Sequence, residues 1–536
     1  MQVVSFSPFG YEGSLVNVEV DLRRGIPAID IVGLSDSSVK EARERMCAAI
    51  ANSGLEFPSE RVLISLSPAD LKKEGAGFDL ALAMAVLSES EKKQYPNEKV
   101  LVMGELELSG KLRPVRGSNA AIQTAHENGI THFIVPDGID YQFPENSKVL
   151  KVKNLQEAAS FSKNLENFVS INNVEKQKQE EIEFPEVDAE ELIDGEFLNK
   201  NSDIVKSIEV AIAGKHNILL TGAPGCGKTL LPQKLIPQLT PLLTEKEAET
   251  VSRIRSLAGF DIYEKGEKLK KSYIPPFRMP HQTASIEGMV GGGSSCRPGE
   301  VTLAHNGTLF LDEAAEFRSS VLQCLRIPLE TKSITLSRAG RSTVFPADFQ
   351  MAMVVEPSPD GAYLSDDKIC LSSKKTIELY WKKFSEPLLD RIEIKNFMDK
   401  ENNKNNYDVS FEKMKERIAT AYKIQRERGV FNSHLTQEQI SQYCKLDEKS
   451  NNYYEKIVSE SGFNHREVFN LLKISLTIAN LDGREQIKLQ DLQEGILISS
   501  NDKMRELLNL VFNKDLKRIE PEKKILKSKS EIGRGV

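Results

Sequence analysis

The sequence predicts an α/β protein of about three domains, and three observations support this prediction. A chain of 536 residues is too long to fold around one hydrophobic core. Short apolar runs typical of strands alternate with helical stretches through residues 1–165, and again through residues 195–400. After residue 401 the strand-like runs stop and apolar residues recur at helical spacing, which indicates a small helical domain.

The first of these regions predicts one compact α/β domain. Apolar residues at helical spacing, ended by Gly54, predict a helix over residues 37–54. Strands are expected at residues 14–22, 61–68 and 132–136. Residues 166–194 are polar and acidic, and we expect a solvated linker there.

The composition excludes several classes of protein. A net charge of −7 and a pI near 5.8 argue against a protein that coats nucleic acid, although a local basic surface stays open. The six cysteines form no CxxC pair, which indicates reduced thiols and a cytoplasmic location. No export signal is recognisable, and no run reaches the roughly 18 apolar residues of a membrane span. We therefore expect no membrane partner.

The second α/β region begins with a glycine-rich loop. Residues 222–229, GAPGCGKT, fit the pattern GxxxxGK[ST] between an apolar run and a helix-capable run. Its glycines let backbone N–H groups turn inward and form an anion cradle with the following helix N-terminus. Lys228 is expected to reach the β- and γ-phosphates, and Thr229 to offer its hydroxyl to Mg²⁺. The predicted cradle residues are Gly222, Ala223, Pro224, Gly225, Cys226, Gly227, Lys228 and Thr229.

An acid pair follows a second apolar run. Residues 308–317, TLFLDEAAEF, have the pattern of a Walker B strand that leads into Asp312 and Glu313. Asp312 is expected to hold Mg²⁺ together with Thr229, and Glu313 to orient or deprotonate the water that attacks the γ-phosphate. With the cradle, this pair predicts ATP and Mg²⁺ as ligands. A third strand is expected at residues 349–356.

Residues 275–317, with FSEPLLDRIEI at 384–394, resemble the magnesium-chelatase-like AAA+ ATPases, specifically the YifB/ComM family. The likeness extends to GELELSGKLRPVRG at 104–117 and covers about residues 1–500. It implies a P-loop AAA+ core with a helical lid, preceded by a Lon-protease-like domain of the ribosomal S5 domain 2-like fold. The implied domains are 1–165 (Lon-like), 195–400 (ATPase core) and 401–500 (lid), with a basic tail over 501–536.

The same resemblance implies a homo-hexameric ring that hydrolyses ATP and acts on branched or single-stranded DNA. A helicase or branch-migration factor of DNA uptake or recombination is the leading interpretation. Two alternatives stay open. One is a chelatase-like or chaperone-like ATPase that remodels a protein partner, and the other is an ATP-binding regulator with weak hydrolysis.

The resemblance also suggests roles for single residues. Arg391 matches the arginine finger that one subunit supplies to the next, and Arg466 matches the sensor-2 arginine; ordinary surface arginines are the alternative. Arg338 and Arg341 flank the turn of a hairpin expected at 331–349, where they either contact DNA phosphates or lie at a solvated tip.

Other positions depart from the family pattern. Glu356 replaces an asparagine, and because a carboxylate brings negative charge beside a polyanion, we expect slow hydrolysis or a changed role. Ser358 and Asp360 replace cysteines, and Gln282 replaces the second residue of a His-His pair, so no zinc site is expected.

The Lon-like domain lacks the residues of a peptidase. The nucleophilic serine would fall at Gly77 and its lysine near Asn119, and neither can do the chemistry, although Ser118 lies one position away. We expect no peptidase activity.

Overall fold

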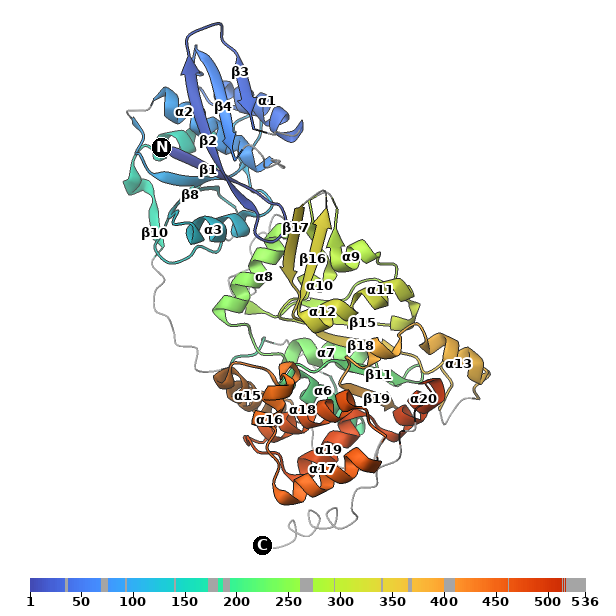
Figure 1. The fold of residues 1–536 in the computed structure, drawn as a ribbon. Coiled ribbons are helices and arrows are strands. Elements are labelled where there is room, and N and C mark those ends of the chain that lie inside the picture. The colour runs from blue at the N-terminus through green and yellow to red at the C-terminus, as the bar shows by residue number, and fades with distance from the viewer. Residues whose placement is uncertain are drawn as a thin grey trace.

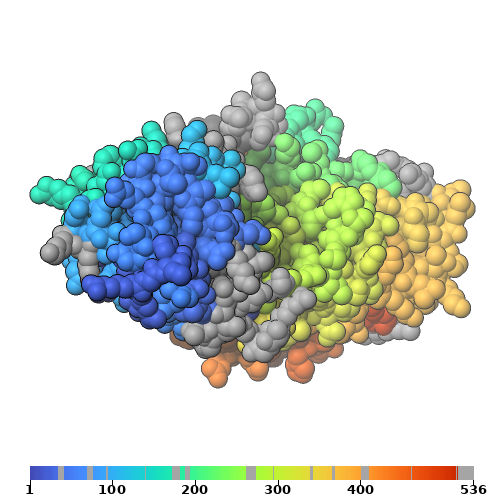
Figure 2. Space-filling view, turned by 90° about the horizontal axis from the view of Figure 1, so that it is seen from above, coloured from blue at the N-terminus to red at the C-terminus, as the bar shows by residue number. Residues whose placement is uncertain are grey.

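The computed structural model describes residues 1–33, 37–68, 76–91, 94–138, 141–171, 182–186, 193–260, 273–293, 295–338, 341–364, 369–399, 410–460, 462–512, 514 and 516. An N-terminal α/β domain, a parallel-sheet core and a helical domain follow one another in space (Figure 1). From above, the blue N-terminal domain lies beside the yellow-green part of the core (Figure 2). Across the described residues, each helix is too short or too polar to traverse a lipid bilayer.

The N-terminal domain is built on an eight-stranded mixed sheet in the order β10-β9-β8-β5-β1-β2-β4-β3. Helix α2 (Asp79–Ser90) is buried along most of its length and packs against β1 and β2. The predicted helix is confirmed as α1 (Ser37–Asn52), and the three predicted strands are confirmed as β2, β4 and β8. The strands are β1 (Gln2–Ser7), β2 (Ser14–Arg23), β3 (Ile29–Val32), β4 (Arg61–Ser67), β5 (Lys99–Val102), β8 (His132–Pro136), β9 (Ser147–Val152) and β10 (Val169–Ile171).

Smaller elements complete this domain. A two-stranded hairpin, β6 (Glu105–Leu106) with β7 (Leu112–Arg113), precedes α3. Helices α3 (Ser118–Glu127) and α4 (Leu155–Phe161) follow, and Asn154 caps α4 by accepting a hydrogen bond from the Glu157 N–H.

The core is a five-stranded parallel sheet in the order β12-β15-β18-β11-β19. Its strands are β12 (Phe277–Arg278), β15 (Thr308–Leu311), β18 (Gln350–Val355), β11 (Ile218–Gly222) and β19 (Ile394–Met398). The last four are completely buried, as continuous apolar runs in a sheet covered on both faces should be. The three strands that we predicted here are confirmed as β11, β15 and β18.

Helices surround this sheet in two groups. Those early in the core are α5 (Gly195–Lys200), α6 (Ser202–Gly214), α7 (Leu230–Leu239) and α8 (Glu245–Ala258), and a Thr244–Glu247 capping box begins α8. The later ones are α9 (Ile286–Val290), α10 (Glu300–Leu303), α11 (Ser319–Cys324), α12 (Arg326–Thr331), α13 (Lys374–Trp381) and α14 (Glu386–Leu389). Short ladders β13 (Gly291–Gly292) with β14 (Arg297–Pro298), and β16 (Ser333–Arg338) with β17 (Arg341–Pro346), lie outside the main sheet.

The helical domain packs on the core through α15 and α18, which contact α6. Its helices are α15 (Phe411–Arg428), α16 (Gln437–Tyr443), α17 (Glu448–Glu460), α18 (His465–Leu481) and α19 (Leu489–Ser499). A further helix, α20 (Asp502–Phe512), buries Met504 and Leu507 in the core cluster around Trp381 and Phe384. From the sequence, residues 502–512 are included in the basic tail, and this boundary is wrong. Their apolar side chains pack into the core of the ATPase domain. The tail from residue 517 lies outside the described residues.

The N-terminal domain contacts the core at α8 and at the β16–β17 hairpin (Figure 1). Arg253 of α8 donates to the carbonyls of Tyr11 and Glu12 at 3.1 and 3.2 Å and to Thr124 Oγ1 at 2.8 Å. Its side chain is only 8% exposed. Tyr11 N–H in turn donates to Thr343 Oγ1 of the hairpin at 3.0 Å. One arginine therefore holds the loop that contacts the hairpin.

Replacing Arg253 by alanine is expected to loosen this contact, because two carbonyls and a hydroxyl lose a buried charged donor. We expect a loss of about 2 kcal/mol in stability and faster hydrogen exchange in α3 and α8. Mass-spectrometric hydrogen exchange measures this. Lys246→Ala, on the exposed side of the same helix, is the control. Unchanged exchange in α3 would contradict the assignment of Arg253 as the anchor.

Candidate functional site

The glycine-rich loop lies at the carboxyl end of β11, directly before α7. Gly227 has φ +91°, and a Cβ there would lie 2.5 Å from the Phe197 ring of α5. A Cβ on Gly222 would lie 2.3 Å from the Met398 carbonyl oxygen. Both positions therefore require glycine, and the loop backbone is shaped as a phosphate cradle needs it to be.

The acid pair meets this loop. Thr229 Oγ1 donates to Asp312 Oδ1 at 2.9 Å, so a hydroxyl and a carboxylate, both suitable Mg²⁺ ligands, lie side by side. Glu313 follows with φ +46° and ψ +48°, a left-handed conformation that is unusual for a glutamate. Strain of this kind is concentrated at functional sites. Loop, hydroxyl and acid pair thus fit a magnesium nucleotide.

Glu356 lies beside the loop lysine. The Lys228 Nζ is 3.5 Å from Glu356 Oε1 and 3.4 Å from the Ala223 carbonyl oxygen, and Lys228 is largely buried. The register that pairs Thr221 with Val355 explains this, because it brings the end of β18 level with the loop. We expect the Glu356 carboxylate beside the triphosphate. In the structure it forms an ion pair with Lys228, the residue that would bind the triphosphate.

Gln282 is a site residue that sequence reasoning missed. Its Nε2 donates to Glu313 Oε2 at 2.5 Å. It comes four residues after β12, the edge strand beside β15. From the sequence, Gln282 is treated only as the replacement of a metal ligand. Its position shortly after β12, in the same sheet as β15, is the sequence signal that could have placed it near Glu313. The adjacent His281 contacts Thr283 instead, at 2.9 Å.

Arg391 and Arg466 lie together, away from the loop. Arg391 precedes β19, and its carbonyl accepts from Asn217 Nδ2 at 2.8 Å, at the amino end of β11. From Asn217 to Gly222 the strand rises roughly 16 Å, so an arginine there cannot reach its own loop. Arg391 pairs with Glu330, and Arg466 Nη2 lies 3.7 Å from the same carboxylate. The hydrogen bond from Arg391 lowers the pKa of Glu330.

The predicted hairpin is confirmed as β16–β17. Arg338 pairs with Arg341 in the antiparallel register, so both residues lie at its free end. The turn residues 339 and 340 lie outside the described residues. Figure 1 shows this hairpin between the N-terminal domain and α12.

Asp360 joins two loops at the positions where the resemblance implied metal-binding cysteines in relatives. It accepts from Ser358 Oγ at 2.5 Å and from the backbone N–H groups of Leu371 and Ser372 at 2.8 and 3.0 Å. Desolvation opposes the ionised form, but hydrogen bonds from Ser358 and backbone amides outweigh it and lower the pKa of Asp360. A charged carboxylate therefore fastens segment 369–373 to the end of β18.

The peptidase positions have other contacts. Gly77 is the middle residue of the short helical turn Ala76–Phe78 before α2, and a Cβ there would lie 3.6 Å from Val115. The Asn119 amide donates to Ser252 Oγ of α8 and accepts from Gln142 N–H, both at 3.1 Å. Ser118 Oγ donates to the Val115 carbonyl at 2.6 Å. Asn119 is therefore part of the contact between the N-terminal domain and the core.

Comparison with known proteins places these features in a family. The model "Magnesium chelatase, subunit ChlI" matches residues 196–406, "Subunit ChlI of Mg-chelatase" residues 18–138, and "Magnesium chelatase, subunit ChlI C-terminal" residues 409–498. Competence protein ComM of Haemophilus influenzae and the uncharacterized protein YifB of Escherichia coli are 32% and 33% identical, each over 92% of this chain and 96% of the relative. A fifth of the chain (20%) is 31% identical to DNA repair protein RadA of Escherichia coli, over 23% of that protein. The chain therefore belongs to the YifB/ComM family of magnesium-chelatase-like AAA+ ATPases.

Proposed function

We propose that this protein is a Mg²⁺-dependent ATPase that works as a ring of identical subunits and remodels DNA. The observation that carries the proposal is the 2.9 Å contact between Thr229 and Asp312, with Glu313 next in the chain. Cradle, metal ligands and general base thus lie at one edge of the sheet. The six free cysteines fit a reducing compartment, which we take to be the cytoplasm.

The residues at this edge have separate tasks. The loop amides and Lys228 bind the phosphates, and Thr229 and Asp312 hold Mg²⁺, which neutralises charge on the phosphates when bound. Glu313 accepts the proton of the attacking water as oxygen adds to the γ-phosphorus and the bond to the bridging oxygen breaks. The Gln282 amide donates to Glu313 Oε2 and so restrains this base.

The position of the arginines supports ring assembly. Arg391 and Arg466 lie at the opposite edge of the sheet from their own loop, so they act on a nucleotide only if it belongs to a neighbouring copy. These features support a shared site between subunits, and the family resemblance suggests six of them.

DNA is the proposed substrate because of the β16–β17 hairpin. The backbone register places Arg338 and Arg341 at its end, while their side chains lie outside the described part of the chain. Arginines at these positions would supply positive charge for phosphates without base readout. The relatives ComM and RadA are named a competence protein and a DNA repair protein, and both names fit a role on DNA. Helicase or branch-migration activity is the form of remodelling that we favour. We propose no peptidase activity, since Gly77 and Asn119 cannot supply it.

A second candidate is an ATP-binding regulator with weak hydrolysis, and the Lys228–Glu356 pair favours it. Bound ATP must draw the lysine away from this carboxylate. Tight binding with negligible turnover, unchanged by DNA, would support this candidate. Capture of a protein partner by Glu313→Gln would instead support a protein-remodelling ATPase.

The main test is conversion of a four-way DNA junction. Wild-type protein with ATP and Mg²⁺ should convert the junction. In Lys228→Ala the rate of ATP turnover should fall by on the order of 100-fold, because the γ-phosphate loses its cation. A gel assay with labelled junctions measures conversion. The double variant Arg338→Ala/Arg341→Ala should keep basal ATP turnover but lose stimulation by DNA. Wild-type turnover without any response to DNA would contradict the DNA proposal.

Glu356→Asn should increase ATP turnover, because Lys228 is released from a competing anion and an amide can donate to the γ-phosphate. If the free energy of ATP binding becomes more favourable by about 1 kcal/mol, the KM for ATP falls roughly fivefold. Steady-state kinetics measures both effects. Glu316→Gln, which removes an exposed carboxylate from the turn after β15, should change neither value. No gain in rate for Glu356→Asn would refute the inhibitory role.

Gln282→Leu should raise basal ATP turnover, because one oxygen of Glu313 is freed from its donor. A lost hydrogen bond of about 1 kcal/mol predicts a roughly fivefold effect. The matched control is His281→Ala, whose side chain contacts Thr283 and not Glu313. A large fall in turnover would show that Gln282 orients the base for catalysis rather than restraining it.

A further inference from the structure

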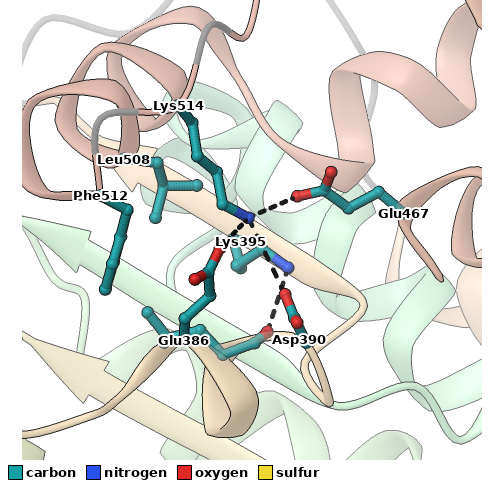
Figure 3. A pocket seen from close by; sticks show the side chains of 8 residues that line it. Glu386, Asp390, Lys395, Glu467, Leu508, Phe512 and Lys514 are labelled. Atoms are coloured by element: carbon teal, nitrogen blue, oxygen red, sulfur yellow. Dashed lines mark hydrogen bonds and ion pairs between the residues drawn. The ribbon is translucent and has the colours of Figure 1, made fainter. Parts of the chain in front are cut away.

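Lys514, which follows α20, lies among three carboxylates (Figure 3). Its Nζ is 3.1 Å from Glu467 Oε1, 3.3 Å from Glu386 Oε1 and 3.9 Å from Asp390 Oδ1. The Lys514 side chain is only 17% exposed, and Leu508 and Phe512 of α20 line the same small pocket. The Glu467 side chain is only 14% exposed, so screening by solvent is weakest for its pair with Lys514, whereas Glu386 is about half exposed.

The three carboxylates belong to the two segments that carry the arginines. Glu386 and Asp390 lie in α14 and directly after it, and Asp390 is adjacent to Arg391. Glu467 lies in the first turn of α18, adjacent to Arg466. Lys514 therefore ties the core segment of one arginine to the lid segment of the other.

Glu330 joins the same two segments on the side of the arginines. The Glu330 carboxylate lies between Arg391 and Arg466 and pairs with both. Lys514 has the converse arrangement, in which one cation pairs with three carboxylates. Glu467 also takes part in the capping box of α18, where its Oε2 accepts from Asn464 N–H at 2.9 Å. Both Glu467 oxygens are thus engaged, and the first turn of α18 is fixed in place.

The turn of Arg391 is held from a second direction by Lys395. This lysine of β19 is buried, and desolvation lowers its pKa. Its Nζ donates to the carbonyls of Ile392 and Leu389, the latter at 3.3 Å. With Asn217 on the Arg391 carbonyl, the backbone of this turn is held on the core side, and Lys514 links it to the lid.

We propose that Lys514 is a positioning residue that holds Arg391 and Arg466 as one unit for the nucleotide of a neighbouring copy. This inference rests on the proposed ATPase function and on the sharing of sites between subunits. Without Lys514, three carboxylates lose their common cation and repel one another, and the lid segment can separate from the core segment. The two arginines would then reach the neighbouring phosphates separately.

Lys514→Met, which keeps the side-chain length without its charge, tests this. We expect kcat to fall about tenfold while KM and saturable ATP binding stay near wild type, because the phosphate loop is untouched. Lys514→Arg should restore most of the rate. The control Lys423→Met removes an exposed lid lysine and should leave both constants unchanged.

Two further readouts separate positioning from a general structural role. In an Arg391→Ala/Arg466→Ala background, Lys514→Met should lower the residual kcat no further, because the lysine acts only through these two arginines. Mixing Lys514→Met with Lys228→Ala should give more ATP turnover than the two variants alone, since some interfaces then combine an intact loop with correctly held arginines. Additive losses, or no gain on mixing, would overturn the proposal.

The outcomes also distinguish this inference from the proposed function. If wild-type protein hydrolyses ATP and Arg391→Ala does so much more slowly, a wild-type kcat for Lys514→Met overturns only the inference. If wild-type protein shows no hydrolysis, both are overturned. Should Lys514→Met fail to fold, Glu467→Gln weakens the same bridge and keeps an oxygen for the cap, so a several-fold lower kcat is expected; an unchanged kcat contradicts the proposal.

Discussion

The parallel register of the core sheet is the constraint on which the rest of the structure depends. Since β11, β15 and β18 run in one direction, their carboxyl ends meet at one edge. That edge carries the phosphate loop, the acid pair and Glu356. The same geometry sends the turn before β19 to the opposite edge, with Arg391. A single subunit therefore carries the phosphate loop and the two arginines on opposite edges of the sheet, and the proposed shared site would join them across a second copy.

Charge is arranged so that most functional cations already have an anion. Lys228 faces Glu356, and the two arginines share Glu330. In each case a phosphate must replace a carboxylate as the partner of the cation. Such exchange lowers the net gain from binding, but it keeps these cations in place before ligand arrives, so less ordering remains to be done. The cationic side chains are thus ordered before the ligand binds, and the affinity for the ligand is lower as a result.

The sequence predicted most of the features that are local in the chain. The phosphate loop, the acid pair, the core strands and the hairpin each follow from a short pattern of residues and spacing. Gln282, Glu330 and Lys514 could not be found in this way, because their partners lie 31 to 136 residues away and only folding brings them together. The apolar side of α20 is visible in the sequence, but the basic residues that follow the helix favour assigning both the helix and these residues to one tail.

The carboxylate of Asp360 has a consequence for the conditions that this protein tolerates. A metal site in this place would come apart with chelators, zinc starvation or thiol oxidation. The bonds here run from one carboxylate to a hydroxyl and backbone amides, so none of these agents removes the acceptor. Because the folded-state pKa of Asp360 is lowered, this contribution to stability is present at neutral pH and is lost only as acid protonates the group. Of these conditions, acid is the one that weakens the joint, and segment 369–373 stays fastened to the core when zinc is scarce.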